Sequence, residues 1–189
     1  MAIPNEKEKY SYADYLTWNE GERLELIDGE IFNMSPAPSP RHQQVLRELT
    51  TAFSVFLREK ECEVFFAPFD VRLLADNKQD VDIINVVQPD LLIVCDKEKL
   101  DEKGCKGAPD MIVEILSPSS VKLDRWKKYQ LYEKAGVKEY WLVDPVNHSV
   151  EIHLLNDAQY KFQGVFTKGD TVTVNLFPDF KLDLDRIFI

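Results

Sequence analysis

Residues 111–116 read Met-Ile-Val-Glu-Ile-Leu, an apolar run with one carboxylate, Glu114, inside it. A short apolar run without alternation is typical of a strand that is buried on both faces of a sheet. A buried charge costs several kcal/mol unless it is paired or bound to a metal. The stretch therefore predicts a central strand in an α/β fold and a specific partner for Glu114.

A second apolar run, residues 89–94, carries Asp90 near its start. The charged loop expected at 96–108 is compatible with a short antiparallel connection between the two runs. If the two strands are neighbours, their carboxylates can converge at one edge of the sheet. Period-two alternation gives each carboxylate apolar companions on its own face: Leu92 and Val94 for Asp90, and Ile112 and Leu116 for Glu114. Two converging carboxylates suit Mg²⁺, which prefers hard oxygen ligands.

The helix expected at about 123–135 supplies a cation to these carboxylates. Lys128 shares a helical face with the residues that should pack against the sheet, which are Leu131, Tyr132 and Ala135. Lys127 is angled toward the more polar face. An inward lysine beside buried carboxylates can pair with them, orient an attacking water or stabilise charge that builds up on a phosphate. Lys128 is therefore the predicted catalytic lysine.

The other segments alternate between helical and extended patterns. A short helix is expected at 12–18, with Ser11 as its N-cap, and a long helix at 40–60. Asp28-Gly29 between two extended runs predicts an N-terminal hairpin. Further strands are expected at 63–74, 140–144, 150–155, 159–166 and 171–177, and the last three should form an antiparallel meander. This order predicts one α/β domain over residues 1–189, with a mixed sheet flanked by helices.

The composition is that of a globular protein, with 44% hydrophobic and 30% charged residues among 189. No apolar stretch approaches the roughly 20 residues that a membrane helix needs. The N-terminus lacks the apolar core of a signal peptide, so the expected location is cytoplasmic. Cys62, Cys95 and Cys105 are odd in number and lack C-x-x-C spacing, so we expect three reduced thiols.

The charge balance bears on nucleic acid as a partner. The formal net charge is −10, whereas non-specific DNA binding depends on Lys and Arg neutralising phosphates. A strong general affinity for DNA is therefore not expected. A local basic strip beside a metal-lined cleft is still compatible with this balance. The candidates for that strip are Arg41, Arg47, Lys122, Arg125 and Lys127.

The residues named above also carry a resemblance. Pro89-Asp90, Lys128 and the segments 114–119, 136–137 and 139–145 together resemble the Uma-type restriction endonucleases, a bacterial family of the PD-(D/E)XK nuclease superfamily. Residues 23–30 and 39–42 resemble the N-terminal part of that family. The resemblance therefore spans nearly the whole chain.

The resemblance implies a restriction-endonuclease-like core and cleavage of phosphodiester bonds that depends on Mg²⁺ or Mn²⁺. Asp90 and Glu114 match the two acidic residues of the motif. Glu25 resembles an additional N-terminal acid, and the main-chain carbonyl of Ile115 is a further candidate ligand. The lysine of the motif is expected two residues after the second acid, where this chain has Leu116. Lys128 would then reach the site from the next helix.

The predicted activity is that of a DNA endonuclease with Asp90, Glu114 and Lys128 as catalytic residues. Arg41, His42 and Lys127 are candidates for contact with the substrate phosphates, and a homodimer is expected by analogy with enzymes that cut both strands. Two other functions stay open. One is a non-catalytic interaction module that keeps the fold, in which Glu114 and Lys128 form a structural ion pair. The other is a metal-dependent hydrolase of a different phosphate ester.

Overall fold

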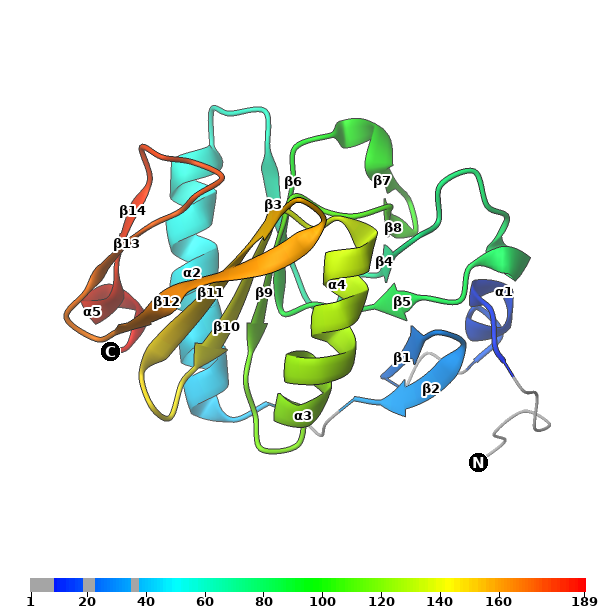
Figure 1. The fold of residues 1–189 in the computed structure, drawn as a ribbon, viewed down its shortest axis with the longest axis horizontal. Coiled ribbons are helices and arrows are strands. Elements are labelled where there is room, and N and C mark those ends of the chain that lie inside the picture. The colour runs from blue at the N-terminus through cyan, green and yellow to red at the C-terminus, as the bar shows by residue number, and fades with distance from the viewer. Residues whose placement is uncertain (1–8, 19–22, 35–37) are drawn as a thin grey trace.

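The computed structural model describes residues 9–18, 23–34 and 38–189 (Figure 1). Within these residues the central sheet has six strands in the order β12-β11-β10-β9-β6-β3. Their bounds are β3 (Glu63–Phe66), β6 (Leu91–Val94), β9 (Met111–Ile115), β10 (Glu139–Asp144), β11 (Ser149–Asn156) and β12 (Gln159–Thr167). Strands β9 and β10 are parallel, and the other neighbours are antiparallel. The predicted mixed sheet is confirmed.

The two apolar runs that carry Asp90 and Glu114 are neighbours in this sheet. Leu91 pairs with Val113 in an antiparallel register, so one further step places Asp90 opposite Glu114. Helix α2 (Pro40–Leu57) covers one face of the sheet, and a second helical segment covers the other (Figure 1). None of the helices described here is long and apolar enough to cross a membrane. Burial on both faces explains why both runs are apolar almost throughout.

The second helical segment has three parts, α3 (Val121–Leu123), the π-helical turn η3 (Asp124–Lys128) and α4 (Tyr129–Ala135). It begins two residues before the expected start. It ends at Gly136, whose φ of 90° is left-handed and costs a glycine little. Single π turns inside α-helices are frequent at functional sites. Here the turn holds Asp124 and Lys128, and both are buried.

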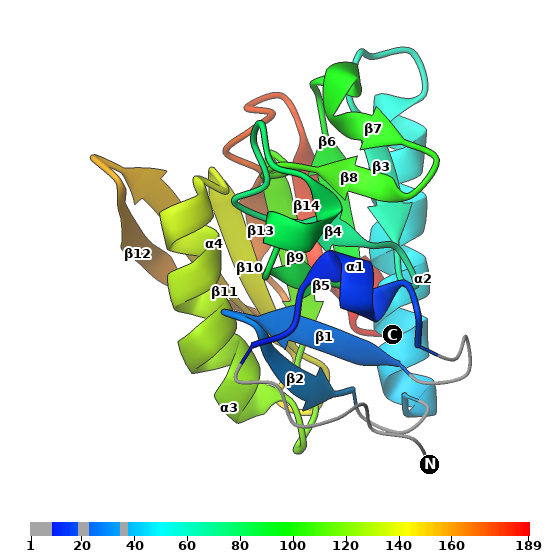
Figure 2. The same ribbon diagram turned by 90° about the vertical axis from the view of Figure 1, so that its right-hand side faces the viewer.

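The N-terminal hairpin belongs to a second sheet in the order β2-β1-β5-β4-β8-β7. Its strands are β1 (Leu24–Ile27), β2 (Glu30–Asn33), β4 (Val71–Arg72), β5 (Val86–Val87), β7 (Leu100–Asp101) and β8 (Gly104–Lys106). Asp28 and Gly29 turn the hairpin with φ values of 52° and 80°, as their sequence predicts. Helix α1 (Tyr12–Tyr15) packs on this sheet and is capped by Ser11. Figure 2 shows the hairpin in front of the central sheet, beside α3.

Three segments differ from their expected structure. The strand expected at 63–74 is divided into β3 and β4, and the loop at 96–108 contains η2 (Lys97–Lys99), β7 and β8. The segment at 171–177 does not extend the meander. Its strand β13 (Thr171–Thr173) pairs instead with β14 (Lys181–Asp183), which precedes α5 (Leu184–Ile187). Between these strands Phe177 and Phe180 pack on Phe56 of α2, and this contact explains why the chain turns back.

The expectation of three reduced thiols is wrong for two of the cysteines. Glu63 pairs with Val94 across β3 and β6, so Cys62 and Cys95 stand at the next position of the register, and they form a disulfide. Cys105 is a buried free thiol, and burial raises its pKa to about 11. Sequence spacing missed the pair because the two cysteines are 33 residues apart and meet only through the strand register.

Candidate active site

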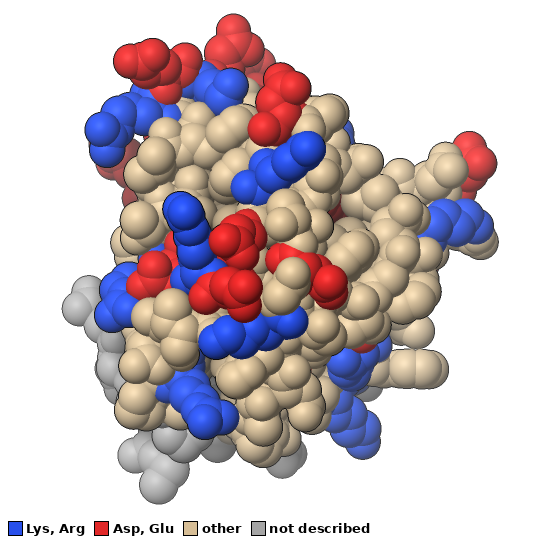
Figure 3. All heavy atoms as spheres, turned by 90° about the vertical axis from the view of Figure 1, so that its left-hand side faces the viewer, with Lys and Arg blue, Asp and Glu red and all other residues tan. Residues whose placement is uncertain are grey.

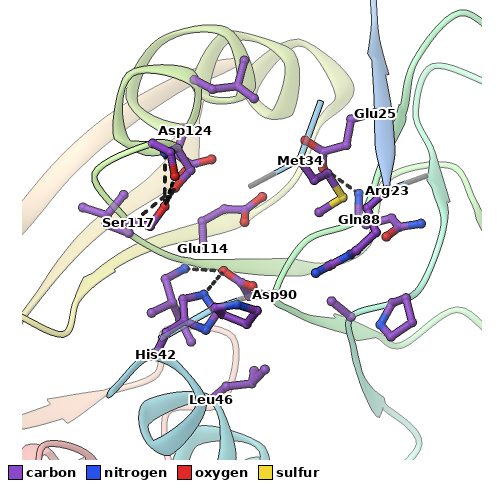
Figure 4. A pocket seen from close by; sticks show the side chains of 18 of the residues that line it. Arg23, Glu25, Met34, His42, Leu46, Gln88, Asp90, Glu114, Ser117 and Asp124 are labelled. Atoms are coloured by element: carbon purple, nitrogen blue, oxygen red, sulfur yellow. Dashed lines mark hydrogen bonds and ion pairs between the residues drawn. The ribbon is translucent and has the colours of Figure 1, made fainter. Parts of the chain in front are cut away.

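A cleft of about 1050 Å³ lies between the end of the central sheet, the β1–β2 hairpin, α2 and the helical segment that begins with α3. Seven residues that the sequence assigned to the site or its substrate contacts line it: Glu25, Arg41, His42, Asp90, Glu114, Ile115 and Lys128. Figure 4 shows the carboxylates of Glu25, Asp90 and Glu114 reaching toward the same space from three segments of the chain. The fold thus gathers residues that are up to 103 positions apart, from Glu25 to Lys128.

Glu114 lies on the face of β9 that α4 covers, and its side chain is 4% exposed. Its Oε1 accepts two hydrogen bonds, one of 3.0 Å from Nζ of Lys128 and one of 2.6 Å from the hydroxyl of Tyr132. Burial raises the pKa of Glu114 well above its usual value, although Lys128 opposes the shift. The side chain of Glu114 is therefore held through its Oε1 atom. Within the described residues, the Oε2 atom accepts no hydrogen bond.

Lys128 is the buried cation of the cleft, with a side chain that is 5% exposed. Its Nζ lies 2.9 Å from Oε1 of Glu25 and 3.0 Å from Oε1 of Glu114. Burial by itself would lower the pKa of the amine, but these carboxylates, together with Asp124, raise it well above its usual value. Lys128 is therefore charged in this site.

Glu25 enters the cleft from strand β1, and its side chain is 2% exposed. Its Oε1 also accepts the main-chain N–H of Gln88 at 2.8 Å. The side chain of Gln88 is itself fixed, because its amide nitrogen donates to Tyr15 and Asp70. The hairpin therefore carries a carboxylate into the end of the central sheet and anchors it there.

Asp90 precedes β6 and has a structural task as well as a place in the cleft. Its Oδ2 accepts the main-chain N–H of Ile115 at 2.8 Å. The side chain of Asp90 thus continues the hydrogen bonding between β6 and β9 beyond their last paired residues, Leu91 and Val113. Nε2 of His42 lies 3.2 Å from the same oxygen and, since a carboxylate oxygen only accepts, is the donor. The side chain of Asp90 is 20% exposed and is thus the most accessible of the three carboxylates.

Two further residues of the site were not predicted. Asp124 in η3 is 1% exposed and lines the cleft, and burial raises its pKa to about 6. Tyr132 binds Glu114, as described above. A sequence signal existed for both, because Asp124 lies four residues before Lys128 and Tyr132 four residues after it, on the same helical face. The sequence carries no such signal for the contact between Glu25 and Gln88, because the donor is the main-chain N–H of Gln88.

Of the basic residues expected to contact substrate, Arg41 lies in the cleft and Lys127 lies outside it. Arg41 lines the cleft at an exposed position, as does Arg23. Lys127 does not line it, since its Nζ donates to Glu30 at 2.6 Å and lies over the ring of Phe32. On the face shown in Figure 3, basic and acidic side chains are interspersed among the residues drawn in colour. Within the described residues, the lysine and arginine side chains that line the cleft are those of Arg23, Arg41 and Lys128.

The donor chemistry of the cleft fits a divalent cation. Four carboxylates, those of Glu25, Asp90, Glu114 and Asp124, line the cleft, and three of them lie within 4 Å of the buried amine of Lys128, so acidic side chains outnumber the buried cation. Among the residues that the structure describes, no three His, Cys, Asp or Glu side chains form a ready-made metal cluster. Mg²⁺ does not need one, because it is commonly held by one or two carboxylates and several waters.

Comparison with known proteins agrees with this architecture. The family model described as "Uma2: Putative restriction endonuclease" matches residues 12–185. The fold is similar to the crystal structure of "a putative nuclease belonging to DUF820" from Anabaena variabilis ATCC 29413, with a TM-score of 0.74 and 21% sequence identity. That match covers 94% of this chain and 97% of the other. The likeness confirms the predicted fold class.

Two relatives from Synechocystis sp. (strain ATCC 27184 / PCC 6803 / Kazusa) are similar in sequence. The "Uncharacterized protein slr1290" is 28% identical over 182 residues, which cover 95% of this chain and 86% of that protein. The "Uncharacterized protein sll1609" is 26% identical over 144 residues, which cover 74% and 77%. Both matches extend over most of each chain.

Proposed function

The chain belongs to the Uma2 family, described as "Putative restriction endonuclease", and we propose that it is a metal-dependent endonuclease that hydrolyses phosphodiester bonds of DNA. The observation that carries this proposal is the excess of buried carboxylates over buried cations in one cleft. Uncompensated charge in a protein interior is costly. A cation of charge +2 would offset that excess and attract a phosphate to the same place.

Asp90 and Glu114 are the proposed metal ligands, with Glu25 and the main-chain carbonyl of Ile115 as additional donors. Mg²⁺ or Mn²⁺ held there would polarise the scissile phosphate and lower the pKa of a bound water. The protein fixes these donors through their other contacts. Oε1 of Glu114 is held by the hydroxyl of Tyr132, and Oδ2 of Asp90 is held by the N–H of Ile115.

Lys128 supplies fixed positive charge beside the reacting phosphate in this proposal. Because the carboxylates beside its amine raise its pKa, it stays protonated and stabilises negative charge that develops on the phosphate oxygens. His42 and Arg41 are proposed to contact the substrate at the rim of the cleft that they line. Lys127 fits this role less well because it is paired with Glu30 outside the cleft.

Cleavage of DNA tests the proposal directly. Supercoiled plasmid and labelled single strands are incubated with the protein in Mg²⁺, in Mn²⁺ and in EDTA, and the products are separated on gels. We expect cleavage with either metal and none in EDTA. Replacing Glu114 or Asp90 by alanine should abolish cleavage, with the near-ultraviolet circular dichroism unchanged. Cleavage that persists in both variants would contradict the assignment.

A non-catalytic module that keeps the nuclease fold is the second candidate. It is favoured by the contacts of Lys128, which occupies an oxygen of both Glu25 and Glu114, and by Leu116 at the position expected for the motif lysine. Titration with Mn²⁺ in a calorimeter separates the two candidates. A nuclease site gives binding heat that is lost in the E114Q variant, whereas a carboxylate cluster neutralised by Lys128 gives none.

The partner and location that we propose follow from this activity. DNA is the proposed substrate, a homodimer would place two sites against the two strands of a duplex, and the cytoplasm is the proposed compartment. Sedimentation velocity tests the dimer, since the chain has a mass of 21.9 kDa and a dimer twice that value. RNA of the same sequence, added to the cleavage assay, tests the choice of DNA.

A further inference from the structure

Asp124 is a buried carboxylate for which the proposed reaction gives no task. It lies in the π turn η3, is 1% exposed and lines the cleft. Its Oδ1 is buried and accepts no hydrogen bond among the described residues. The nearest cation is Lys128, whose Nζ lies 3.6 Å from this oxygen. At that distance the two groups are not hydrogen-bonded. The oxygen can therefore still accept a hydrogen bond.

Lys128 has closer partners in this structure. Its amine lies 2.9 Å from Glu25 and 3.0 Å from Glu114, which are the carboxylates that would hold a divalent cation in the proposed function. A cation that draws on these carboxylates competes with Lys128 for their charge. An ammonium that loses both partners in an enclosed site is left unpaired, which is strongly unfavourable.

We infer that Asp124 is a positioning residue that receives Lys128 when Glu25 and Glu114 take up a divalent cation. The inference rests on the proposed function, because it assumes that a metal binds. Asp124 and Lys128 are four residues apart on one helical segment, so a small change of the lysine side chain is enough to close the gap. Lys128 then keeps an anionic partner and stays beside the metal instead of leaving the cleft.

The placement of the other polar groups agrees with this role. Tyr132 already donates to Glu114, so its hydroxyl proton is engaged. Asp90 accepts from the N–H of Ile115 and from His42 through its Oδ2 atom, whereas the ion pairs of Lys128 within the described residues are with Glu25, Glu114 and Asp124. Within the described part of the chain, Asp124 is thus the carboxylate within 4 Å of the amine that is not a proposed metal ligand.

A double-mutant cycle tests the inference through metal affinity, with no need for catalysis. Calorimetric titration with Mn²⁺ at pH 7.5 compares the wild type with the D124N, K128M and D124N/K128M variants. We expect D124N to weaken Mn²⁺ binding about tenfold, the effect of 1.4 kcal/mol. In the K128M background the same substitution should leave the affinity unchanged, because no ammonium then needs a new partner.

D110N is the matched control. Asp110 is also a buried carboxylate that pairs with a lysine, Lys138 at 2.6 Å, but it does not line the cleft. Its substitution should leave the Mn²⁺ affinity as in the wild type. If D124N does not fold, D124S and the shift of the melting temperature on Mn²⁺ addition provide the same comparison.

Each other outcome overturns the inference in a distinct way. Equal weakening by D124N in both backgrounds would make Asp124 a direct metal ligand. An unchanged affinity in D124N would leave it a structural residue. Absence of Mn²⁺ binding to the wild type would overturn the proposed function and this inference together, whereas the first two results overturn this inference alone.

Discussion

The hydroxyl of Tyr132 donates a hydrogen bond of 2.6 Å to Oε1 of Glu114, and both side chains are buried. The contact fixes the carboxylate from the helical side of the sheet. A tyrosine that donates to a buried carboxylate contributes more than one that donates to a neutral carbonyl, since bonds to charged groups are the stronger class. The relationship ties the geometry of the cleft to the packing of α4.

Replacement of Tyr132 by phenylalanine should therefore affect both stability and metal binding. We expect Y132F to lose about 1.5–3 kcal/mol of unfolding free energy, and to bind Mn²⁺ more weakly because Glu114 is less well held. Urea unfolding and calorimetry measure the two effects. Y160F is the control, since the buried Tyr160 hydroxyl donates to the carbonyl of Val137 at 3.0 Å. A loss of Mn²⁺ affinity in Y160F as large as in Y132F would contradict the role of Tyr132.

Removal of the buried amine should strongly destabilise the metal-free protein. K128M leaves Glu25 and Glu114 without their cation, and breaking a buried ion pair on one side costs about 3–5 kcal/mol. Urea unfolding in EDTA measures this loss. K138M is the comparison, because Lys138 also pairs with a buried aspartate but its side chain is 65% exposed. We expect less than about 1 kcal/mol there. Similar losses in the two variants would show that Lys128 is not the main compensating charge.

Asp124 should make the stability depend on pH between about 4 and 6. Burial raises its pKa from 3.8 to about 6, against the opposing effect of Lys128. In this window the folded protein keeps a proton that the unfolded chain has released, so unfolding free energy falls as the pH rises. The contribution is at most about 3 kcal/mol, at about 1.4 kcal/mol for each pKa unit.

The D124N variant isolates this contribution. Asparagine does not titrate, so the difference in unfolding free energy between D124N and the wild type should grow in favour of D124N from pH 4 to pH 7. Denaturant unfolding at intervals of half a pH unit measures it. A constant difference across that range would show that Asp124 has no raised pKa in the folded protein.

Asp90 should respond differently to two substitutions. Asparagine keeps an oxygen that can accept the N–H of Ile115, whereas alanine leaves this buried donor unpaired. We expect D90A to lose about 1–3 kcal/mol of stability relative to D90N. Both should lose metal-dependent cleavage, because neither supplies a carboxylate. Equal stability of the two variants would contradict the structural task assigned to Asp90.

Much of this fold could be predicted from local patterns. The runs around Asp90 and Glu114 are buried, as their apolar composition predicts, and they pair with each other in the sheet. Asp28-Gly29 forms its hairpin because few other residues accept its backbone angles. The expected meander was wrong for residues 171–177, because the strand there, β13, pairs with β14, while Phe177 and Phe180 pack on Phe56 of α2.

Features that depend on strand register and side-chain direction were harder to predict, both in the fold and in the site. The disulfide between Cys62 and Cys95 follows from the pairing of β3 with β6, which spacing does not reveal. The main-chain contact of Gln88 with Glu25 has no side-chain signature. Asp124 was overlooked although its four-residue spacing from Lys128 pointed to a shared helical face.

The most direct test of the central claim compares the single-turnover rate of DNA cleavage in Mg²⁺ between two variants. Each variant replaces one of two buried glutamates on adjacent strands. Glu114 on β9 faces the cleft, whereas Glu139 on β10 is fully buried, binds Trp141 and the N–H groups of Asn175 and Leu176, and does not line the cleft. We predict that E114Q lowers the rate at least about a thousandfold, equivalent to about 4 kcal/mol, and that folded E139Q cleaves at nearly the wild-type rate. Cleavage by E114Q at the rate of E139Q would contradict the account.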